Sequence, residues 1–141
     1  MTISESIIRW LRGFSGGIAA TDKISIDQLP ADSDVYGVFK SPGDVTTNFL
    51  GGSRDVTAYY LFITRHSSQT NEMRAANQAW MESLESWIRK QNLARNLPEL
   101  GDGRTCWSVS IANSYTAQEQ DDDGTVYQFS IEINYHEEAI T

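Results

Sequence analysis

The residues of this chain that could carry out chemistry are two histidines, one cysteine and several carboxylates. His66 and His136 each lie at or just past the end of an expected strand, so their imidazoles could meet if those strands are neighbours. A metal ion would still need a third and a fourth ligand, for which Cys106 or a carboxylate is the obvious donor. The spacing is not that of a metal site. We therefore interpret both histidines as surface or rim residues and predict no metal.

Cys106 has the residue type of a nucleophile, which a histidine could activate. A single thiol at the start of an expected strand is more often a small apolar filler. The sequence holds no motif of a serine hydrolase, a P-loop protein, a dinucleotide-binding fold or a zinc protease. Residues 101–104 are expected to form a turn with a nearby cation. They do not form a glycine-rich loop that would bind a phosphate. We predict no catalytic residue, no cofactor and no enzyme.

The carboxylates gather in the second half of the chain. The net charge is −8; residues 1–70 carry 6 basic and 7 acidic side chains, and residues 71–141 carry 5 and 12. The acidic run at residues 121–124 resembles a fragment of a calcium loop but lacks the ligand spacing of an EF-hand, which favours a solvated turn. This charge argues against a general nucleic-acid binder and against attraction to anionic lipid, and leaves DNA only as a repelled cargo.

The length of 141 residues predicts a single domain over residues 1–141. One cysteine allows no internal disulfide, so the chain needs no oxidising compartment. No apolar run approaches the ~20 residues of a membrane helix. The N-terminus has Glu5 before its apolar residues and does not resemble a signal peptide. We expect a cytoplasmic protein without a membrane partner.

Two helices are expected in the fold that positions the histidine, cysteine and carboxylate side chains. Residues 2–14 should form the first, with a capping box of Thr2 and Glu5, and Gly16 and Gly17 should end it. Its apolar stripe consists of Ile3, Ile7, Trp10, Leu11 and Phe14. This helix needs a surface to cover, either its own sheet or a neighbouring subunit.

The second helix is expected at residues 71–92. Its apolar stripe consists of Met73, Ala76, Trp80, Leu84, Trp87 and Ile88. Glu82, Glu85 and Arg89 are expected largely off the stripe, with Glu85 and Arg89 spaced as a weakly stabilising ion pair. The helix tryptophans and Trp107 have the residue type that anchors a partner, but their spacing favours the core.

Strands are expected at residues 23–27, 35–39, 55–65, 105–113 and 125–135. A turn at residues 41–44 should close the second of them. Residues 40–54 should form an exposed connection, in which Phe49 and Leu50 either dock onto a partner or fold back onto their own core. Residues 114–124 should form a long acidic link.

The strand at residues 55–65 is apolar on both faces. One face carries Val56, Ala58, Tyr60 and Phe62, and the other carries Tyr59, Leu61 and Ile63. A strand with one wet face alternates apolar and polar residues, so this strand is either central and covered twice or covered on one side by a partner chain. Together the elements predict an α+β fold: a single mixed, mostly antiparallel sheet of four to five strands, with an N-terminal helix and one long helix packed on it.

The chain also shows a family resemblance. It rests on the tyrosine-rich strand at residues 57–65, the tryptophan-bearing helix, residues 97–105, and the Tyr-Gln-Phe strand at residues 126–135. In this order they resemble the tail terminator proteins of long-tailed bacteriophages, also called tail completion or minor capsid proteins, over most of residues 1–138. The resemblance implies an α+β fold and a structural protein that assembles as a homo-oligomeric ring, usually of six copies.

That ring caps the tail tube, ends its polymerisation and gives the head connector its docking surface. The implied partners are copies of the chain itself, the tail tube protein and a head-completion or connector protein. The implied location is the head-proximal end of the tail in the virion, after assembly in the host cytoplasm. DNA would pass through the ring only as cargo.

A closed ring requires two different, complementary patches on each subunit. We expect the subunit interface to involve Trp10, Arg12, Phe49, Leu50 and Arg54, with Arg54 pairing with the acidic loop at residues 119–123 of the adjacent subunit. An acidic lumen or loop is expected to contain Glu119, Asp121, Asp122 and Asp123, where like charge would keep DNA from sticking.

Three other functions remain open. Another neck or head–tail joining component of a phage particle would have the same size and class, and would bind the portal or the head-completion protein in place of tail tubes. A small cytoplasmic enzyme such as an acyltransferase would place a glycine-rich cofactor loop between strand and helix, whereas residues 64–71 contain no glycine. An acidic inhibitor that mimics DNA would bind a basic nucleoprotein.

Overall fold

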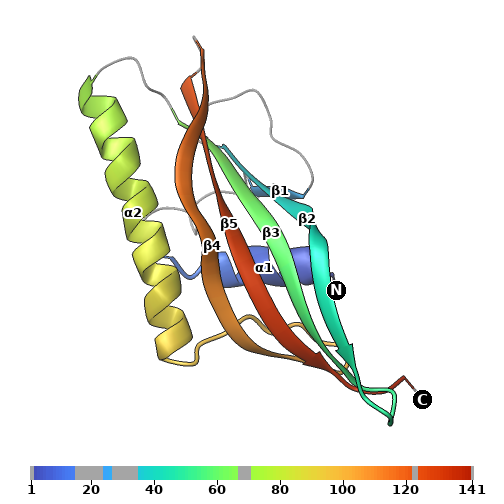
Figure 1. The fold of residues 1–141 in the computed structure, drawn as a ribbon. Coiled ribbons are helices and arrows are strands. Elements are labelled where there is room, and N and C mark those ends of the chain that lie inside the picture. The colour runs from blue at the N-terminus through green and yellow to red at the C-terminus, as the bar shows by residue number, and fades with distance from the viewer. Residues whose placement is uncertain (1, 15–23, 27–34, 67–70, 122–123, 141) are drawn as a thin grey trace.

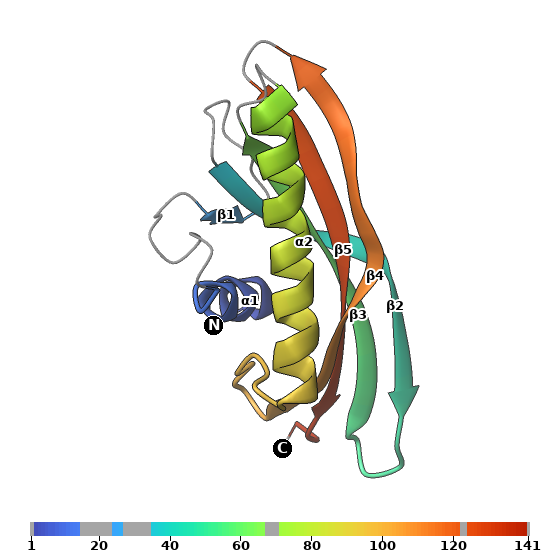
Figure 2. The ribbon, with the colours of Figure 1, turned by 90° about the vertical axis from the view of Figure 1, so that its left-hand side faces the viewer.

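The chain folds into two layers, a twisted sheet and two helices that lie on one of its faces (Figures 1 and 2). The computed structural model describes residues 2–14, 24–26, 35–66, 71–121 and 124–140. The elements follow one another as α1, β1, β2, β3, α2, β4 and β5. This confirms the expected α+β class, with a mixed, mostly antiparallel sheet and a helix at each of the two expected places.

The sheet has five strands in the order β1-β2-β3-β5-β4. Their bounds are Ile24–Ile26 for β1, Val35–Asn48 for β2, Arg54–His66 for β3, Arg104–Asp121 for β4 and Gly124–Glu137 for β5. β1 pairs in parallel with β2, and the other neighbours are antiparallel. β3 lies at the centre of the sheet. Both described helices lie on one face of the sheet, so cover of the second apolar face of β3 by a partner chain stays a prediction.

The predicted connection at residues 40–54 is wrong, because β2 continues through it to Asn48. The expected turn at residues 41–44 is a β-bulge, with the pairing to β3 shifting between Ser41 and Val45. Pro42 is tolerated there because β2 has no partner on its outer side at this point among the described residues. The turn lies further along, at Phe49–Ser53, where the backbone N–H of Phe49 donates to Ser53 O at 2.9 Å.

The predicted link at residues 114–124 is also wrong, because β4 extends to Asp121. Its polar composition is typical of a loop, but its backbone pairs with the apolar β5 along its length. Tertiary pairing outweighs the weak strand preference of these residues. The pairing shifts register in several places, one of them between Asn113 and Thr116.

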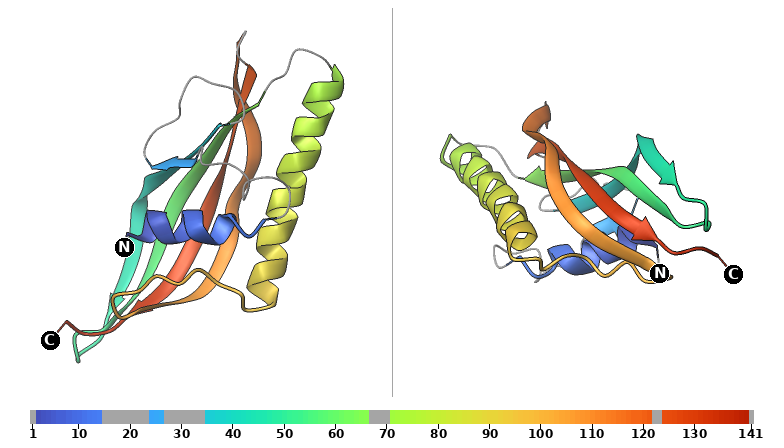
Figure 3. Two further views of the ribbon diagram at one scale, coloured as in Figure 1. Left: turned by 180° about the vertical axis from the view of Figure 1, so that it is seen from behind. Right: turned by 60° about the horizontal axis from the view of Figure 1, so that its bottom comes forward.

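The two helices form where they are expected. α1 (Ile3–Leu11) begins with the predicted capping box: the N–H of Glu5 donates to Thr2 Oγ1 at 3.1 Å. The predicted ending by Gly16 and Gly17 lies outside the described residues, and α1 itself ends before them. α2 (Asn71–Leu93) matches its predicted range closely. Figure 3 shows α1 crossing the sheet while α2 runs along its edge.

The buried face of α2 differs from the predicted stripe. Leu84 and Ile88 are buried as expected, but so are Met81 and Glu85, whereas Ala76 is exposed. The predicted surface position of Glu85 is therefore wrong. α2 lies over the edge strand β4, so its buried face must meet both apolar side chains and the polar edge of the sheet.

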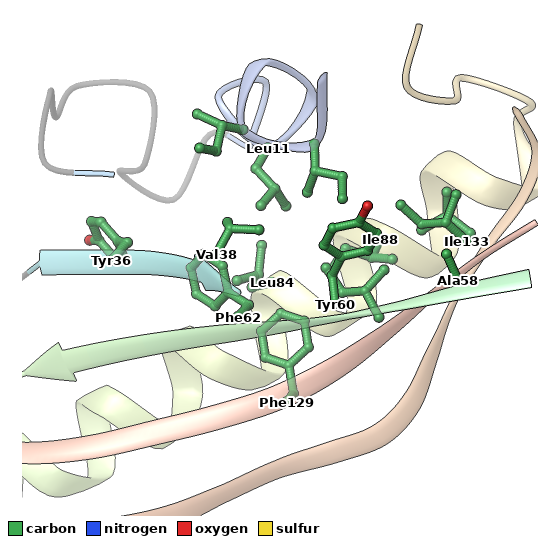
Figure 4. Close-up of a cluster of buried hydrophobic side chains, with 14 of the residues drawn as sticks. Leu11, Tyr36, Val38, Ala58, Tyr60, Phe62, Leu84, Ile88, Phe129 and Ile133 are labelled. Atoms are coloured by element: carbon green, nitrogen blue, oxygen red, sulfur yellow. The ribbon is translucent and has the colours of Figure 1, made fainter. Parts of the chain in front are cut away.

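The core lies between the helices and the sheet. Its side chains come mainly from α1, β2, β3, α2 and β5, with Val109 from β4, and Figure 4 shows Leu11, Val38, Phe62, Leu84 and Phe129 among those that converge there. Aromatic rings pack across the strands within this cluster: Phe62 lies 5.1 Å from Phe129 and 5.9 Å from Tyr36, measured between ring centroids. The cluster fixes the sheet against both helices and so determines which parts of the sheet remain uncovered.

Candidate self-association surfaces

The end of the β2–β3 hairpin, residues 44–54, forms an arm that extends past the end of α2 (Figure 2). Cross-strand pairs run from Val45 with Thr57 to Asn48 with Arg54, so the arm is regular up to its tip. Gly52 has a φ of +93°, and a Cβ there would lie 3.3 Å from the Cβ of Ala139. Glycine is favoured at this position because it allows both the left-handed turn and the close approach of the C-terminal segment.

The arm carries exposed apolar side chains. Leu50 at the tip is fully exposed, and Val45 and Phe49 are exposed beside it. Ile140, exposed next to Ala139, adds to the same surface because Ala139 approaches Gly52. We call this surface the arm patch, defined by Val45, Phe49, Leu50 and Ile140. Apolar residues concentrated at one exposed tip are typical of a contact with another macromolecule.

Two cross-strand side-chain contacts hold the arm against β5. Arg54 Nε lies 2.6 Å from Glu137 Oε1, in the directly opposite position of β5. His136 Nδ1 lies 2.7 Å from Asp55 Oδ1, also directly opposite, and the His136 ring contacts Phe49 at 6.3 Å between centroids. Cross-strand pairs of this kind stabilise the local sheet modestly. They fix the direction in which the arm points.

A second exposed apolar surface lies across the sheet, where the end of α2 meets β4. Leu93 is 76% exposed and Trp107 is 49% exposed. The predicted core position of Trp107 is wrong, because β4 shifts register between Cys106 and Ser108 and leaves Trp107 without a partner in β5. We call this surface the rim patch, defined by Leu93 and Trp107.

The rim patch is built on a firm junction between α2 and the outer edge of β4. Asn92 Oδ1 accepts the backbone N–H of Val109 at 2.9 Å, and Arg95 Nη1 donates to Trp107 O at 3.0 Å. A cavity of about 220 Å³ opens beside it, lined by Ile88, Arg89, Asn92, Val109, Ser110 and Ile111. This volume is below the ~300 Å³ at which small-molecule sites begin. Cavities of about 510, 410 and 310 Å³ lie elsewhere in the described chain.

The face of the sheet opposite the helices is partly open. Tyr59, Leu61 and Ile63 of β3 are half-buried there, and no helix of the described chain covers them. Polar groups of β5 lie beside them: the Tyr59 hydroxyl donates to Glu132 Oε1 at 3.2 Å. Burial and the hydrogen bond to Glu132 together raise the pKa of Tyr59, the bond being the larger cause. The face is mixed in character, because apolar side chains and hydrogen-bonded polar groups lie side by side on it.

The residues predicted to form the interface separate into two groups. Phe49 and Leu50 are exposed at the arm tip, and Arg12 is exposed at the end of α1. Trp10 packs inside the chain, 5.0 Å from Trp87 between ring centroids, and its Nε1 donates to Asn96 O at 2.8 Å. Arg54 pairs with Glu137 of its own chain. Sequence reasoning missed Val45, Leu93 and Ile140.

Two of the four predicted acidic residues lie at the opposite end of β4 from the rim patch. Glu119 and Asp121 belong to β4, where their backbones pair with Val126 and Gly124 of β5. Asp122 and Asp123 lie outside the described residues. The prediction that these four carboxylates line a lumen stays a prediction.

The residues considered for chemistry are not brought together. His66 pairs with Thr125 at one end of the sheet, and His136 pairs with Asp55 toward the other. In the described part of the chain, no three histidine, cysteine, aspartate or glutamate residues could jointly hold a metal ion. Arg104 donates to the carbonyls of Gly101 and Leu100, at 3.2 Å and 3.0 Å, so its guanidinium is used within the turn.

The thiol of Cys106 is expected to react slowly. Burial raises the pKa of Cys106, so less thiolate is present at neutral pH than for a free cysteine. We expect a disulfide reagent at pH 8 to label the folded protein at least tenfold more slowly than the urea-unfolded protein. Equal rates in the two states would show that the thiol is accessible and would reopen a nucleophilic role for it.

Comparison with models of known protein families gives no match, and comparison with curated protein sequences gives none. None of the described helices is both long and apolar enough to cross a bilayer.

Proposed function

We propose that this chain is a structural protein of a long-tailed phage that forms a ring on the head-proximal end of the tail tube. The ring ends tube polymerisation and gives the connector or head-completion protein its docking surface. The sequence resemblance suggests this function, and the α+β fold agrees with what the resemblance implies. The chain then acts by shape, joining copies of itself on a larger particle.

One observation carries the proposal. The large apolar side chains that are exposed in the described chain gather on the arm patch and the rim patch, at opposite edges of the sheet. Two separate apolar surfaces on one subunit allow heterologous, head-to-tail contacts between copies. Such contacts form a ring when the rotation between neighbouring subunits closes.

The proposal is tested on tail tubes that are polymerised from the tube protein of the same phage. We expect the purified protein, added during polymerisation, to shorten the tubes and to appear by negative-stain microscopy as a ring at one tube end. Light scattering measures its copy number. Tubes of unchanged length and bare ends would contradict the proposal. Binding to the portal in place of tubes would favour another head–tail joining component.

A further inference from the structure

We infer that the arm patch of one copy packs against the rim patch of the next copy, so that this chain associates head to tail. The inference rests on the proposed ring and specifies which surfaces close it. The occupant of each patch is therefore a second copy of this chain.

The distribution of exposed apolar residues supports this pairing. In the described chain the large exposed apolar side chains are Val45, Phe49, Leu50, Leu93, Trp107 and Ile140. All of them belong to the arm patch or the rim patch. β2 and β4 lie on opposite sides of β3 and β5, about 14 Å apart at ~4.8 Å per strand. The arm patch and the rim patch, on opposite sides of the sheet, therefore cannot cover each other within one copy. The arm patch of one copy can contact the rim patch of another.

The base of the arm patch lies at the same height along the strands as Trp107 of the rim patch. Val45 pairs with Thr57, Thr57 pairs with Asn134, and Asn134 pairs with Ser108. Val45 and the residue that follows Trp107 therefore lie in one row across the sheet, and the tip of the arm extends beyond that row. If copies are related by rotation about an axis along the strands, Val45 and Trp107 of neighbouring copies meet without a shift along that axis. A rotation without a shift closes a ring, whereas a shift gives an open helix.

Charge favours the same contact. Residues 40–55, which include the arm, and the adjoining end of β5 carry two cations and four carboxylates: Lys40, Arg54, Asp44, Asp55, Glu137 and Glu138. Residues 86–98, around Leu93, carry Arg89, Lys90 and Arg95 and no carboxylate. The arm region of one copy, with a net charge of −2, would thus meet residues 86–98 of the next copy, with a net charge of +3. This charge difference orients the approach of the two copies.

Side chains are expected to form this contact. α2 already uses the outer edge of β4, because Asn92 and Glu85 accept the N–H groups of Val109 and Tyr115. The cavity of about 220 Å³ beside Trp107 offers space for an apolar side chain of the next copy. Shape and apolar area at the two patches therefore determine the affinity.

Two matched variants of the full-length chain test the inference. Leu50→Asp places a charge in the arm patch and leaves the rim patch intact. Leu93→Asp places a charge in the rim patch and leaves the arm patch intact. Ala75→Asp adds the same charge at an exposed site of α2 outside both patches and serves as the control. Circular dichroism checks that all three fold, which is expected because each site is exposed. Light scattering and sedimentation over a range of concentrations report the assembly state.

We expect each leucine variant alone to associate at least tenfold more weakly than wild type, and Ala75→Asp to assemble as wild type. An equimolar mixture of the two leucine variants should form 1:1 dimers and nothing larger, because it retains one intact arm and one intact rim. If wild type assembles only on tube ends, the same variants and mixture are compared there by microscopy.

Other outcomes separate the two proposals. If wild type forms rings and either leucine variant still forms them, or if the mixture gives no dimer, the pairing of patches is wrong and the ring stands. If wild type stays monomeric both in solution and on tubes, the ring and the pairing both fail.

Discussion

Replacing Phe62 by alanine is expected to lower the free energy of unfolding by about 3–5 kcal/mol. The Phe62 side chain is fully buried at the centre of the sheet and contacts the rings of Tyr36 and Phe129. Removing the side chain leaves a cavity between β2, β3 and β5 that the neighbouring side chains do not fill. At about 2–4 °C per kcal/mol for a domain of this size, the melting temperature should fall by roughly 6–20 °C.

Phe39→Ala is the matched control. Phe39 lies on the neighbouring strand β2 but on the half-buried, open face, opposite Leu61. The same chemical change should therefore cost clearly less than at Phe62. Thermal and urea unfolding followed by circular dichroism measure both. Equal losses in the two variants would mean that the open face is as well packed as the core.

Replacing Glu85 by alanine is expected to cost about 1–3 kcal/mol, because the buried Glu85 carboxylate is the acceptor of the half-buried backbone N–H of Tyr115, which loses its partner. Glu85 accepts the backbone N–H of Tyr115 at 2.6 Å and the hydroxyl of Ser114 at 3.0 Å. Ser114 and Tyr115 have no partner in β5, since the register shifts between Asn113 and Thr116. The Glu85 carboxylate thus supplies the hydrogen-bond acceptors that β5 does not offer at these two residues, and it connects α2 to β4.

Glu82→Ala is the control for this prediction. Glu82 lies nearly one turn earlier on α2, is exposed, and accepts a hydrogen bond from the Tyr115 hydroxyl at 3.0 Å. Both substitutions raise helix propensity equally, so the difference between them isolates the buried contacts. Urea unfolding should show a loss well below 1 kcal/mol for Glu82→Ala. A similar loss for both variants would contradict the anchoring role of Glu85.

The sequence predicts the elements of this fold because most have a regular apolar period. The capping box of Thr2 and Glu5 is present as expected, and the two apolar faces of β3 indicate its central place. Boundaries at residues 40–54 and 114–124 are not predictable in this way. Pro42 and the polar run after Asn113 are typical of loops, and only the pairing with β3 and β5 keeps them extended.

The candidate site is predictable in part. Phe49 and Leu50 stand out because they are apolar residues inside a polar stretch, and both are exposed. The rim patch has no such signal, because Trp107 alternates with Val109 as a core residue does. Its exposure follows from a register shift that depends on β5, and the burial of Trp10 follows from the position of Trp87. Both depend on contacts between distant parts of the chain.

The protected edges of the sheet also bear on the solubility of this chain. An outer strand with free backbone groups invites other chains to add strands without limit, and so leads to fibres. Here Pro42 interrupts the outer side of β2, and α2 occupies donors of β4 at Val109 and Tyr115. A chain whose outer strands are occupied in this way can reach a high concentration without adding strands edge to edge.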